Sequence, residues 1–230
     1  VPSLKDEIGG FNSYNQNLID LNNRCGRNYP NIFSLPGQNP SLVPNQIIKK
    51  HKIVAKENSF SLDLGCGMKP RNPFDSHNIF GVDLNSSVDD ICVFSADLSS
   101  EKIPFGNNIF QFCTAFDVIE HIPRIQLVRR GLSRKLKTFY PFVQLLNEIY
   151  RVIEPDGYFL HFTPAYPAKQ AFQDPTHVNI ITEDTFPDYF CSRNSRTAVA
   201  SMYGFKGSFR LIEQVWVNDI WLVGLLQVLK

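Results

Sequence analysis

The sequence has almost no excess of charge of either sign. Its 230 residues include 23 Lys and Arg against 22 Asp and Glu, for a formal net charge of +1. Proteins dedicated to binding nucleic acids normally carry a marked basic excess. The balance therefore argues against that class, although a local basic patch is compatible with it.

Long apolar runs are also lacking. No apolar stretch near the start of the chain resembles a signal peptide. The longest apolar run, residues 220–229, is too short to span a bilayer, which takes about 20 residues. We therefore expect no secretory leader, no membrane span and a cytoplasmic location.

Cysteine is present in an uninformative pattern. The number is odd, and no two cysteines have the short spacing of a zinc knuckle or a redox motif. Because free cysteine is commonly buried, we expect reduced thiols inside the protein and a reducing compartment. The five residues are Cys25, Cys66, Cys92, Cys113 and Cys191.

The composition that is present suits a single large domain with an extension. Hydrophobic residues make up 43% of the chain and charged residues 20%, which is enough apolar material for a packed core. Residues 1–45 are rich in Asn, Pro, Ser and Gly and predict an N-terminal extension with one helix near residues 14–23, which wraps over the core or forms a lid. Residues 46–230 form the main domain.

Short apolar runs alternate with polar loops from residue 58 onward. Residues 139–153 have helical spacing, and a Pro155-Asp156-Gly157 turn follows them. Residues 205–217 and 219–229 predict a terminal hairpin that turns near Asn218 and Asp219. This order predicts a doubly wound α/β fold with a mostly parallel sheet and an antiparallel hairpin at its C-terminal end. The other predicted strands are residues 60–64, 79–84, 91–96, 109–116 and 158–163.

Four of these strands end in a carboxylate. Ligands of open parallel sheets bind outside the carboxyl ends of the strands, so the four acids should line one crevice. Gly65 and Gly67 allow the backbone to approach a ligand closely. The acids are Asp63, Asp83, Asp97 and Asp117.

The loop after the first strand distinguishes two nucleotide-type ligands. Asp83, placed 20 residues after Asp63, can accept hydrogen bonds from a ribose diol. Pro70 and Pro73 make a long helix directly after the glycines unlikely, and such a helix normally holds a pyrophosphate. S-adenosylmethionine has no pyrophosphate, so the loop favours it; an NAD-dependent enzyme is a distant alternative.

Residues 58–165 resemble the class I S-adenosylmethionine-dependent methyltransferases of the ubiquinone-biosynthesis type, whose sheet has seven strands in a Rossmann-like arrangement. Lys69 departs from the family, which often has a third glycine there. The motifs that carry the resemblance are Asp63-Leu64-Gly65-Cys66-Gly67, Gly81-Val82-Asp83, Ala96-Asp97-Leu98, Phe116-Asp117-Val118-Ile119-Glu120-His121-Ile122 and the segment from Asn147 to Gly157.

The resemblance implies a role for each matching position. Asp63, Gly65 and Gly67 would line the methionine part of the cofactor, and Asp83 with Leu84 would bind the ribose. The adenine would lie between Asp97 and Leu98, and Asp117 with Val118 would lie beside the cofactor. The alternative is that the glycines only make a tight turn and that Asp83 and Asp97 are caps or exposed strand ends.

The acceptor side depends on histidine, the usual base near neutral pH. His177 lies in a polar loop after the fifth strand, and Asp174 could orient it as a base; the alternative is a turn whose side chains cap the backbone. His121 is a second candidate base or a structural residue. A metal site of Asp174, His177 and Asp117 is conceivable, but ligand spacing does not support it, and His161 is predicted to be a core residue.

The loop containing His177 resembles bacterial methyltransferases that modify surface polysaccharides or sugar-containing metabolites. Five of the nine residues 129–137 are basic, which predicts an exposed loop or a rim that attracts an anionic acceptor. We therefore expect O-methylation of a hydroxyl on a glycan, sugar or small polar metabolite. The alternatives are a nucleic-acid methyltransferase, although the Asn/Asp-Pro-Pro-aromatic pattern is missing after Phe116, and a non-catalytic protein that retains the fold.

Overall fold

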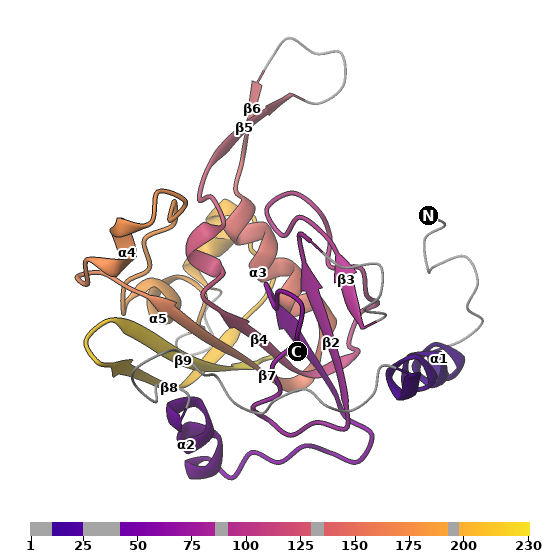
Figure 1. Cartoon of the computed structure of the whole chain (residues 1–230). Coiled ribbons are helices and arrows are strands. Elements are labelled where there is room, and N and C mark those ends of the chain that lie inside the picture. Colours follow the sequence, from indigo (N-terminus) through magenta and orange to yellow (C-terminus); the bar gives the residue numbers. More distant parts are fainter. Residues whose placement is uncertain (1–10, 25–41, 86–91, 130–135, 193–197) are drawn as a thin grey trace.

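The computed structural model describes residues 11–24, 42–85, 92–129, 136–192 and 198–230. Its centre is a seven-stranded sheet (Figure 1). The strands are β1 (Phe60–Leu64), β2 (Asn78–Asp83), β3 (Val93–Ser95), β4 (Phe110–Phe116), β7 (Ile153–Pro164), β8 (Phe209–Val217) and β9 (Trp221–Val228), in the spatial order β3-β2-β1-β4-β7-β9-β8. Neighbours from β3 to β7 pair in parallel, and β9 is antiparallel to both β7 and β8. The predicted fold class is confirmed.

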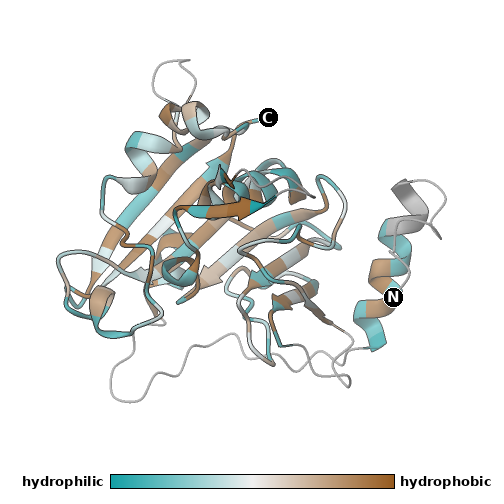
Figure 2. Ribbon diagram, turned by 90° about the horizontal axis from the view of Figure 1, so that it is seen from above, coloured by the Kyte–Doolittle hydropathy of each residue, from teal (hydrophilic) through white to brown (hydrophobic). Residues whose placement is uncertain are grey.

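The central strands form because they are apolar on both faces. Every residue of β1 and β4 is buried, as expected for parallel strands covered on both sides. Side chains of successive residues point to opposite faces, so Phe159 belongs to one apolar cluster and Leu160 to the other. Figure 2 shows the apolar colour concentrated along these strands.

The helices pack around this sheet. They are α1 (Phe11–Arg24), α2 (Leu42–Lys50), α3 (Pro141–Val152), α4 (Gln170–Gln173) and α5 (Thr185–Tyr189), with 3-10 turns η1 (Ile119–His121) and η2 (Val199–Tyr203). None of the helices in the described ranges is long and apolar enough to cross a membrane.

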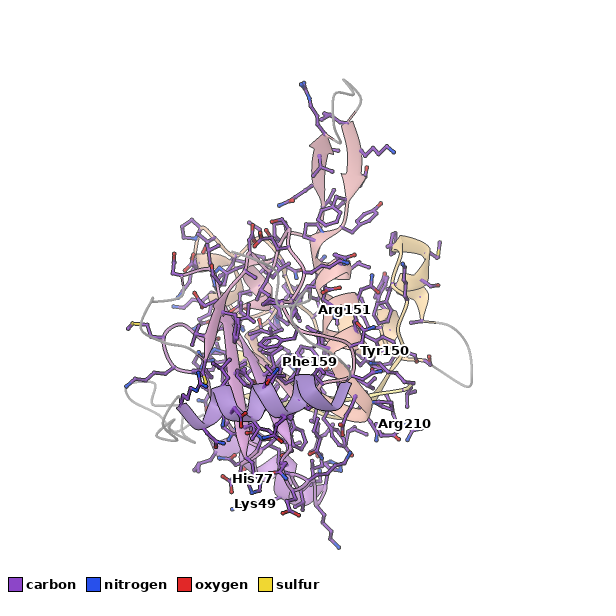
Figure 3. All side chains as sticks on the ribbon, turned by 90° about the vertical axis from the view of Figure 1, so that its right-hand side faces the viewer. Lys49, His77, Tyr150, Arg151, Phe159 and Arg210 are labelled. Carbon is purple, nitrogen blue, oxygen red and sulfur yellow. The ribbon has the colours of Figure 1, made fainter. Side chains whose placement is uncertain are left out.

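Helix α3 confirms the predicted helix over residues 139–153, with shorter ends. It begins at Pro141, whose missing N–H costs nothing in the first turn. Arg151, labelled in Figure 3, donates hydrogen bonds to Glu148 (2.6 Å) and to the carbonyl oxygens of Ile103 and Phe105 (2.9 and 2.7 Å). These contacts tie the helix to the loop that leads into β4.

Helix α1 confirms the helix predicted near residues 14–23. Its Leu18 is buried in the core, and the Asn22 side chain accepts a hydrogen bond from the Ile79 N–H (2.9 Å). This part of the N-terminal extension therefore packs against β2. A lid role for residues 1–45 stays a prediction, and residues 1–10 and 25–41 lie outside the described residues.

The loop of residues 65–77 contains no helix. This agrees with the expectation from Pro70 and Pro73. A hydrogen-bonded turn closes the loop instead. Asn72 Nδ2 donates to the Ser76 carbonyl oxygen (2.9 Å), and the Ser76 N–H donates to Asn72 Oδ1 (3.0 Å). The chain therefore reaches β2 without helix N-terminal amides after the glycines.

Two predicted turns fall where expected. Asn218 and Asp219 adopt φ of 52° and 53° and close the β8–β9 hairpin. The Pro155-Asp156-Gly157 turn lies inside β7 as a bulge, because the β4 partners Phe110 and Phe112 pair with Ile153 and Tyr158. Strand β7 is therefore longer than the predicted residues 158–163.

A two-stranded ribbon formed by β5 (Gln126–Arg129) and β6 (Leu136–Phe139) projects from the body (Figures 1 and 3). It includes both ends of the basic stretch 129–137, so the expectation of a simple loop is wrong at these ends. Leu127 and Leu136 are exposed on it. The remaining basic residues, 130–135, lie outside the described part of the chain.

The cysteines are not all reduced. Cys66, Cys113 and Cys191 are buried thiols outside any disulfide, as expected. Cys92 is disulfide-bonded, so the expectation is wrong there, and Cys25 lies outside the described residues. The argument for a reducing compartment loses this support, and a cytoplasmic location stays a prediction.

The buried pair of His161 and Gly224 generates a stability test. The two residues face each other across β7 and β9, and a Cβ on Gly224 would lie 2.2 Å from the His161 Nε2 atom. The imidazole is fully buried and stacks on Phe186 at a ring-centroid distance of 4.2 Å. His161 is therefore a core residue, as predicted, and burial lowers its pKa to about 3, which keeps the ring neutral.

We expect Gly224→Ala to lower the free energy of unfolding by about 1–3 kcal/mol, because the methyl group overpacks the imidazole. Urea denaturation measures the change. In a His161→Ala background the ring is absent, so the same substitution should cost much less. Equal costs in the two backgrounds would contradict the steric explanation.

Candidate functional site

The predicted acids all lie at the carboxyl edge of the sheet. Asp63 of β1 is in register with Gly81 of β2 and Thr114 of β4, one position before β1 ends. Asp83 ends β2 opposite Ser95 of β3. Parallel pairing therefore brings the loops after β1, β2, β3 and β4 to one edge, the edge at which open parallel sheets generally bind ligands.

The loop after β1 requires its two glycines. Gly65 and Gly67 adopt φ of 61° and 60°, a region that disfavours other residues. A Cβ on Gly65 would also lie 2.4 Å from Cγ2 of Val118, whereas no atom lies within 4 Å of the corresponding position on Gly67. Gly65 thus allows the loop to approach the segment after β4, and Gly67 lies beside open space.

Asp83 connects this loop to the end of β2. Its Oδ2 accepts a hydrogen bond from the Gly67 N–H (2.8 Å), and its Oδ1 accepts one from the Asn85 N–H (3.0 Å). The side chain is partly exposed, so the carboxylate keeps lone pairs for a further donor. Leu84 lies next to it and is exposed.

Asp63 is fully buried, and both of its oxygens are bound by the protein. Oδ1 accepts from the Thr114 hydroxyl (2.7 Å), and Oδ2 accepts from the Arg71 N–H (2.8 Å). Burial raises the pKa of Asp63 to about 6, against the charge of Arg71. Its carboxylate therefore holds the loop of residues 65–71 in place.

Arg71 contacts the predicted site residue Asp63, and the sequence analysis did not single it out. Its guanidinium lies 5.1 Å from the centroid of the Phe116 ring, and its Nη1 donates to the Phe116 carbonyl oxygen (3.2 Å). Arg71 also opposes the rise in pKa of Asp117. In the sequence, Arg71 is a single basic residue between Pro70 and Pro73. Such a residue does not indicate where in the fold its side chain will lie.

Asp97 closes a local turn after β3. Its carboxylate accepts hydrogen bonds from the Ser99 hydroxyl and N–H (2.6 and 2.8 Å) and from the Ser100 hydroxyl (2.8 Å). The Ser99 hydroxyl holds the pKa of Asp97 below its usual value. Leu98 is buried in the core. The capping interpretation thus describes this carboxylate, and contact with adenine stays a prediction.

Asp117 takes an uncommon backbone conformation directly after β4. Its φ is 52°, and its N–H donates to the Phe162 carbonyl oxygen of β7 (2.8 Å). Burial raises the pKa of Asp117 to about 6, while Arg71, Trp221 and His177 act in the opposite direction. Val118 follows, and its side chain occupies the space that a side chain on Gly65 would need.

A second cluster, formed by Glu120, His121 and His177, lies beside this segment. Glu120 is 1% exposed, and its Oε2 accepts a hydrogen bond from the Thr163 hydroxyl (2.8 Å), whereas Oε1 has no partner. Burial raises the pKa of Glu120 to about 8. One potential ligand atom from each of the three residues lies within 4.8 Å of the others. The metal site considered in the sequence analysis, with Asp117, Asp174 and His177 as ligands, shares only His177 with this cluster.

The two imidazoles meet edge to face, with ring centroids 4.8 Å apart. His177 Nδ1 bonds to the Gln170 carbonyl oxygen (3.0 Å). His121 Nδ1 bonds to the Thr176 hydroxyl (2.9 Å), which donates to Asp174 (2.6 Å). Asp174 therefore orients His121 through Thr176, whereas the sequence analysis paired it with His177.

The loop after β7 is fastened to η1, and this brings His177 to His121. The N–H groups of Val178 and Asn179 both donate to the Glu120 carbonyl oxygen (3.0 and 2.9 Å). The Asn179 side chain donates to the Ile119 carbonyl oxygen (2.9 Å) and accepts from Arg124 Nε (2.7 Å). These residues are more than fifty positions apart in the chain, so no local pattern reveals the contact.

A cavity of about 310 Å³ opens at the same edge of the sheet, next to β7 and β8. Tyr166 and Trp216 supply aromatic surface, and Trp216 Nε1 donates to Glu183 (3.3 Å). The cavity can therefore contact the face of a ring and hydrogen-bond polar groups. Its lining residues are Tyr166, Pro167, Thr182, Glu183, Asp184 and Trp216.

Comparison with known proteins supports the fold. No protein-family model matches the sequence, and no curated protein does. Similar solved structures include the YcgJ protein of Bacillus subtilis (TM-score 0.52, 11% identity, covering 81% of this chain and 98% of that one) and the PH0226 protein of Pyrococcus horikoshii (TM-score 0.52, 15% identity, 88% and 97%). A methyltransferase dependent on S-adenosylmethionine from Aquifex aeolicus is also among them (TM-score 0.49, 12% identity, 91% and 97%). At these identities the similarity concerns the fold alone, which is Rossmann-like.

The buried Asp63 makes folding depend on pH. Its pKa rises from 3.8 to about 6 on folding, so the folded state holds the proton more tightly than the unfolded chain does. The resulting stabilisation is complete below pH 3.8 and is lost as the pH rises through about 6. We expect the stability of the wild type relative to Asp63→Asn to fall by about 3 kcal/mol over that window. Urea denaturation across the window measures it, and a constant difference would contradict the burial effect.

Proposed function

We propose that the chain is an S-adenosylmethionine-dependent methyltransferase that methylates a hydroxyl of a sugar or another small polar metabolite. The observation that carries the proposal is the link between Asp83 and the Gly67 N–H, beside open space at the carboxyl edge of the sheet. This hydrogen bond connects a carboxylate that can bind a ribose to a glycine loop that a ligand can approach closely, both at the edge where such sheets bind ligands.

The residues at this edge fit S-adenosylmethionine better than a dinucleotide. The absence of a helix in residues 65–77 removes the amides that a pyrophosphate needs. Gly65 and Gly67 would pass along the methionine portion, in a loop that Asp63 holds in place. Asp83 with Leu84 would bind the ribose, Asp97 and Leu98 would flank the adenine, and Asp117 with Val118 would border the sulfonium end.

The acceptor hydroxyl would meet the cluster of His121 and His177. Bound S-adenosylmethionine supplies a methyl group on a positively charged sulfur, which a hydroxyl oxygen takes by in-line displacement. The protein must align that oxygen, exclude water and help its proton to leave. We assign activation of the hydroxyl to the two imidazoles, oriented by Gln170 and by Thr176 with Asp174.

The cavity beside β7 supports a ring-shaped polar acceptor. The aromatic side chains of Tyr166 and Trp216 suit the apolar face of a sugar ring, and the carboxylates of Glu183 and Asp184 suit its hydroxyl groups. The basic residues Arg129 and Lys137 on the β5–β6 ribbon would attract an anionic portion, as in a nucleotide-linked sugar.

The ribose assignment is tested by Asp83→Asn. The change keeps the side-chain size but removes a charged acceptor, so S-adenosylmethionine should bind about 10- to 100-fold more weakly. Isothermal titration calorimetry measures the affinity. Asp156→Asn, at an exposed carboxylate in the β7 bulge, is the matched control. If wild type fails to bind the cofactor, the whole class of function is wrong.

The acceptor assignment is tested by His177→Ala. We expect turnover to fall by about 10²- to 10⁴-fold while the affinity for S-adenosylmethionine stays unchanged, because the imidazole acts on the hydroxyl. Release of S-adenosylhomocysteine with a panel of nucleotide-linked sugars reports turnover. His77→Ala, at an exposed histidine (Figure 3), serves as the control. Undiminished turnover in His177→Ala would remove this residue from the mechanism.

A further inference from the structure

The cluster of Glu120, His121 and His177 has the composition of a metal site with two imidazoles and one carboxylate. We propose that these three residues bind a divalent transition-metal cation, zinc or a neighbouring metal of the first transition row. Imidazole nitrogens with one carboxylate oxygen suit such cations. The metal site itself is independent of the proposed function, whereas the role assigned to it below rests on that function.

The hydrogen bonds leave one nitrogen free on each imidazole. A carbonyl oxygen only accepts, so His177 Nδ1, bonded to Gln170, carries a proton. The Thr176 hydroxyl gives its hydrogen to Asp174, so His121 Nδ1 must also donate. In both neutral rings the lone pair is then on Nε2. Donation through the other nitrogen is how protein metal sites usually fix and orient their histidines.

Glu120 supplies a carboxyl oxygen that has no hydrogen-bond partner. The side chain is 1% exposed, and Oε2 is held by the Thr163 hydroxyl, which fixes the orientation of the group. Oε1 is buried without a hydrogen-bond partner. A buried oxygen without a partner is costly, and a bound cation would replace the carboxyl proton of Glu120 and give this oxygen a partner.

The spacing and charge of the cluster suit a cation. One potential ligand atom from each of the three residues lies within 4.8 Å of those of the other two. Ligands of a tetrahedral zinc ion are roughly 3.3–3.6 Å apart, so closure needs side-chain shifts of about 1 Å. The acidic groups of Asp117 and Asp174 act electrostatically on Glu120, so both lie near the cluster.

The position of the cluster gives the cation a role in the proposed reaction. Three protein ligands leave coordination positions open, as in catalytic metal sites. Glu120 is three residues after Asp117, at the sulfonium end of the proposed cofactor site. A cation here would bind the acceptor oxygen and promote loss of its proton to water. His121 and His177 would then act as ligands instead of accepting that proton themselves.

Cobalt binding to the full chain tests the site in the absence of S-adenosylmethionine. After treatment with a chelator and dialysis, we expect the protein to bind one Co²⁺ per chain, with the visible absorption of a nitrogen-ligated, low-coordinate ion. Glu120→Gln and His177→Ala should each weaken binding by at least 100-fold. Thr176→Val, which removes only the support of His121, should weaken it about 10- to 100-fold.

The controls separate this site from adventitious binding. His77→Ala should bind Co²⁺ as the wild type does. His177→Ala changes a partly exposed residue, so it carries the test even if Glu120→Gln does not fold. No Co²⁺ or Zn²⁺ binding by the wild type, or binding that both ligand variants retain, overturns the proposal. A chain that binds metal but not S-adenosylmethionine would refute the proposed function and leave the metal site standing.

The acceptor role is tested with thiocyanate. An ion with open coordination positions should bind this anion and shift its Co²⁺ absorption. A spectrum that thiocyanate leaves unchanged would indicate a closed structural site and would overturn the acceptor role.

Discussion

Val118 packs so closely on Gly65 that the loop after β1 cannot carry a side chain at that position. The same short segment after β4 accepts two hydrogen bonds at the Glu120 carbonyl oxygen from the loop after β7. The loop after β1 and the loop after β7 therefore both approach residues 117–121. Displacement of this segment would separate the proposed cofactor loop from His177, so the remaining contacts depend on it.

Burial of two carboxyl groups is an energetic cost of this arrangement. The carboxylate of Asp63 is compensated at both oxygens, by Thr114 and Arg71, and its role is to hold a loop. The carboxyl group of Glu120 is compensated at only one oxygen. The two acids are buried to nearly the same extent, and they differ in that one oxygen of Glu120 has no hydrogen-bond partner.

Much of the fold could be predicted because its signals are local. Apolar runs bounded by turn residues indicated the strands of the main sheet, and Asn218 with Asp219 marked the terminal turn. The β5–β6 ribbon was missed because each strand has only four residues and none of them is buried, so no apolar run marks them. The disulfide at Cys92 was missed because cysteine pairing depends on spatial proximity, which spacing did not reveal.

The sequence by itself determined the chemical types at the crevice: glycines in one loop, acids at strand ends and histidines in two later segments. Each lies in a local motif whose backbone preference is short-range. Only the tertiary structure decided which of these groups meet. Parallel pairing brought Asp83 to Gly67, and hydrogen bonds between distant loops placed His177 beside His121 and Glu120. Hydrogen-bond partners across more than fifty residues are set by packing, which no local pattern encodes.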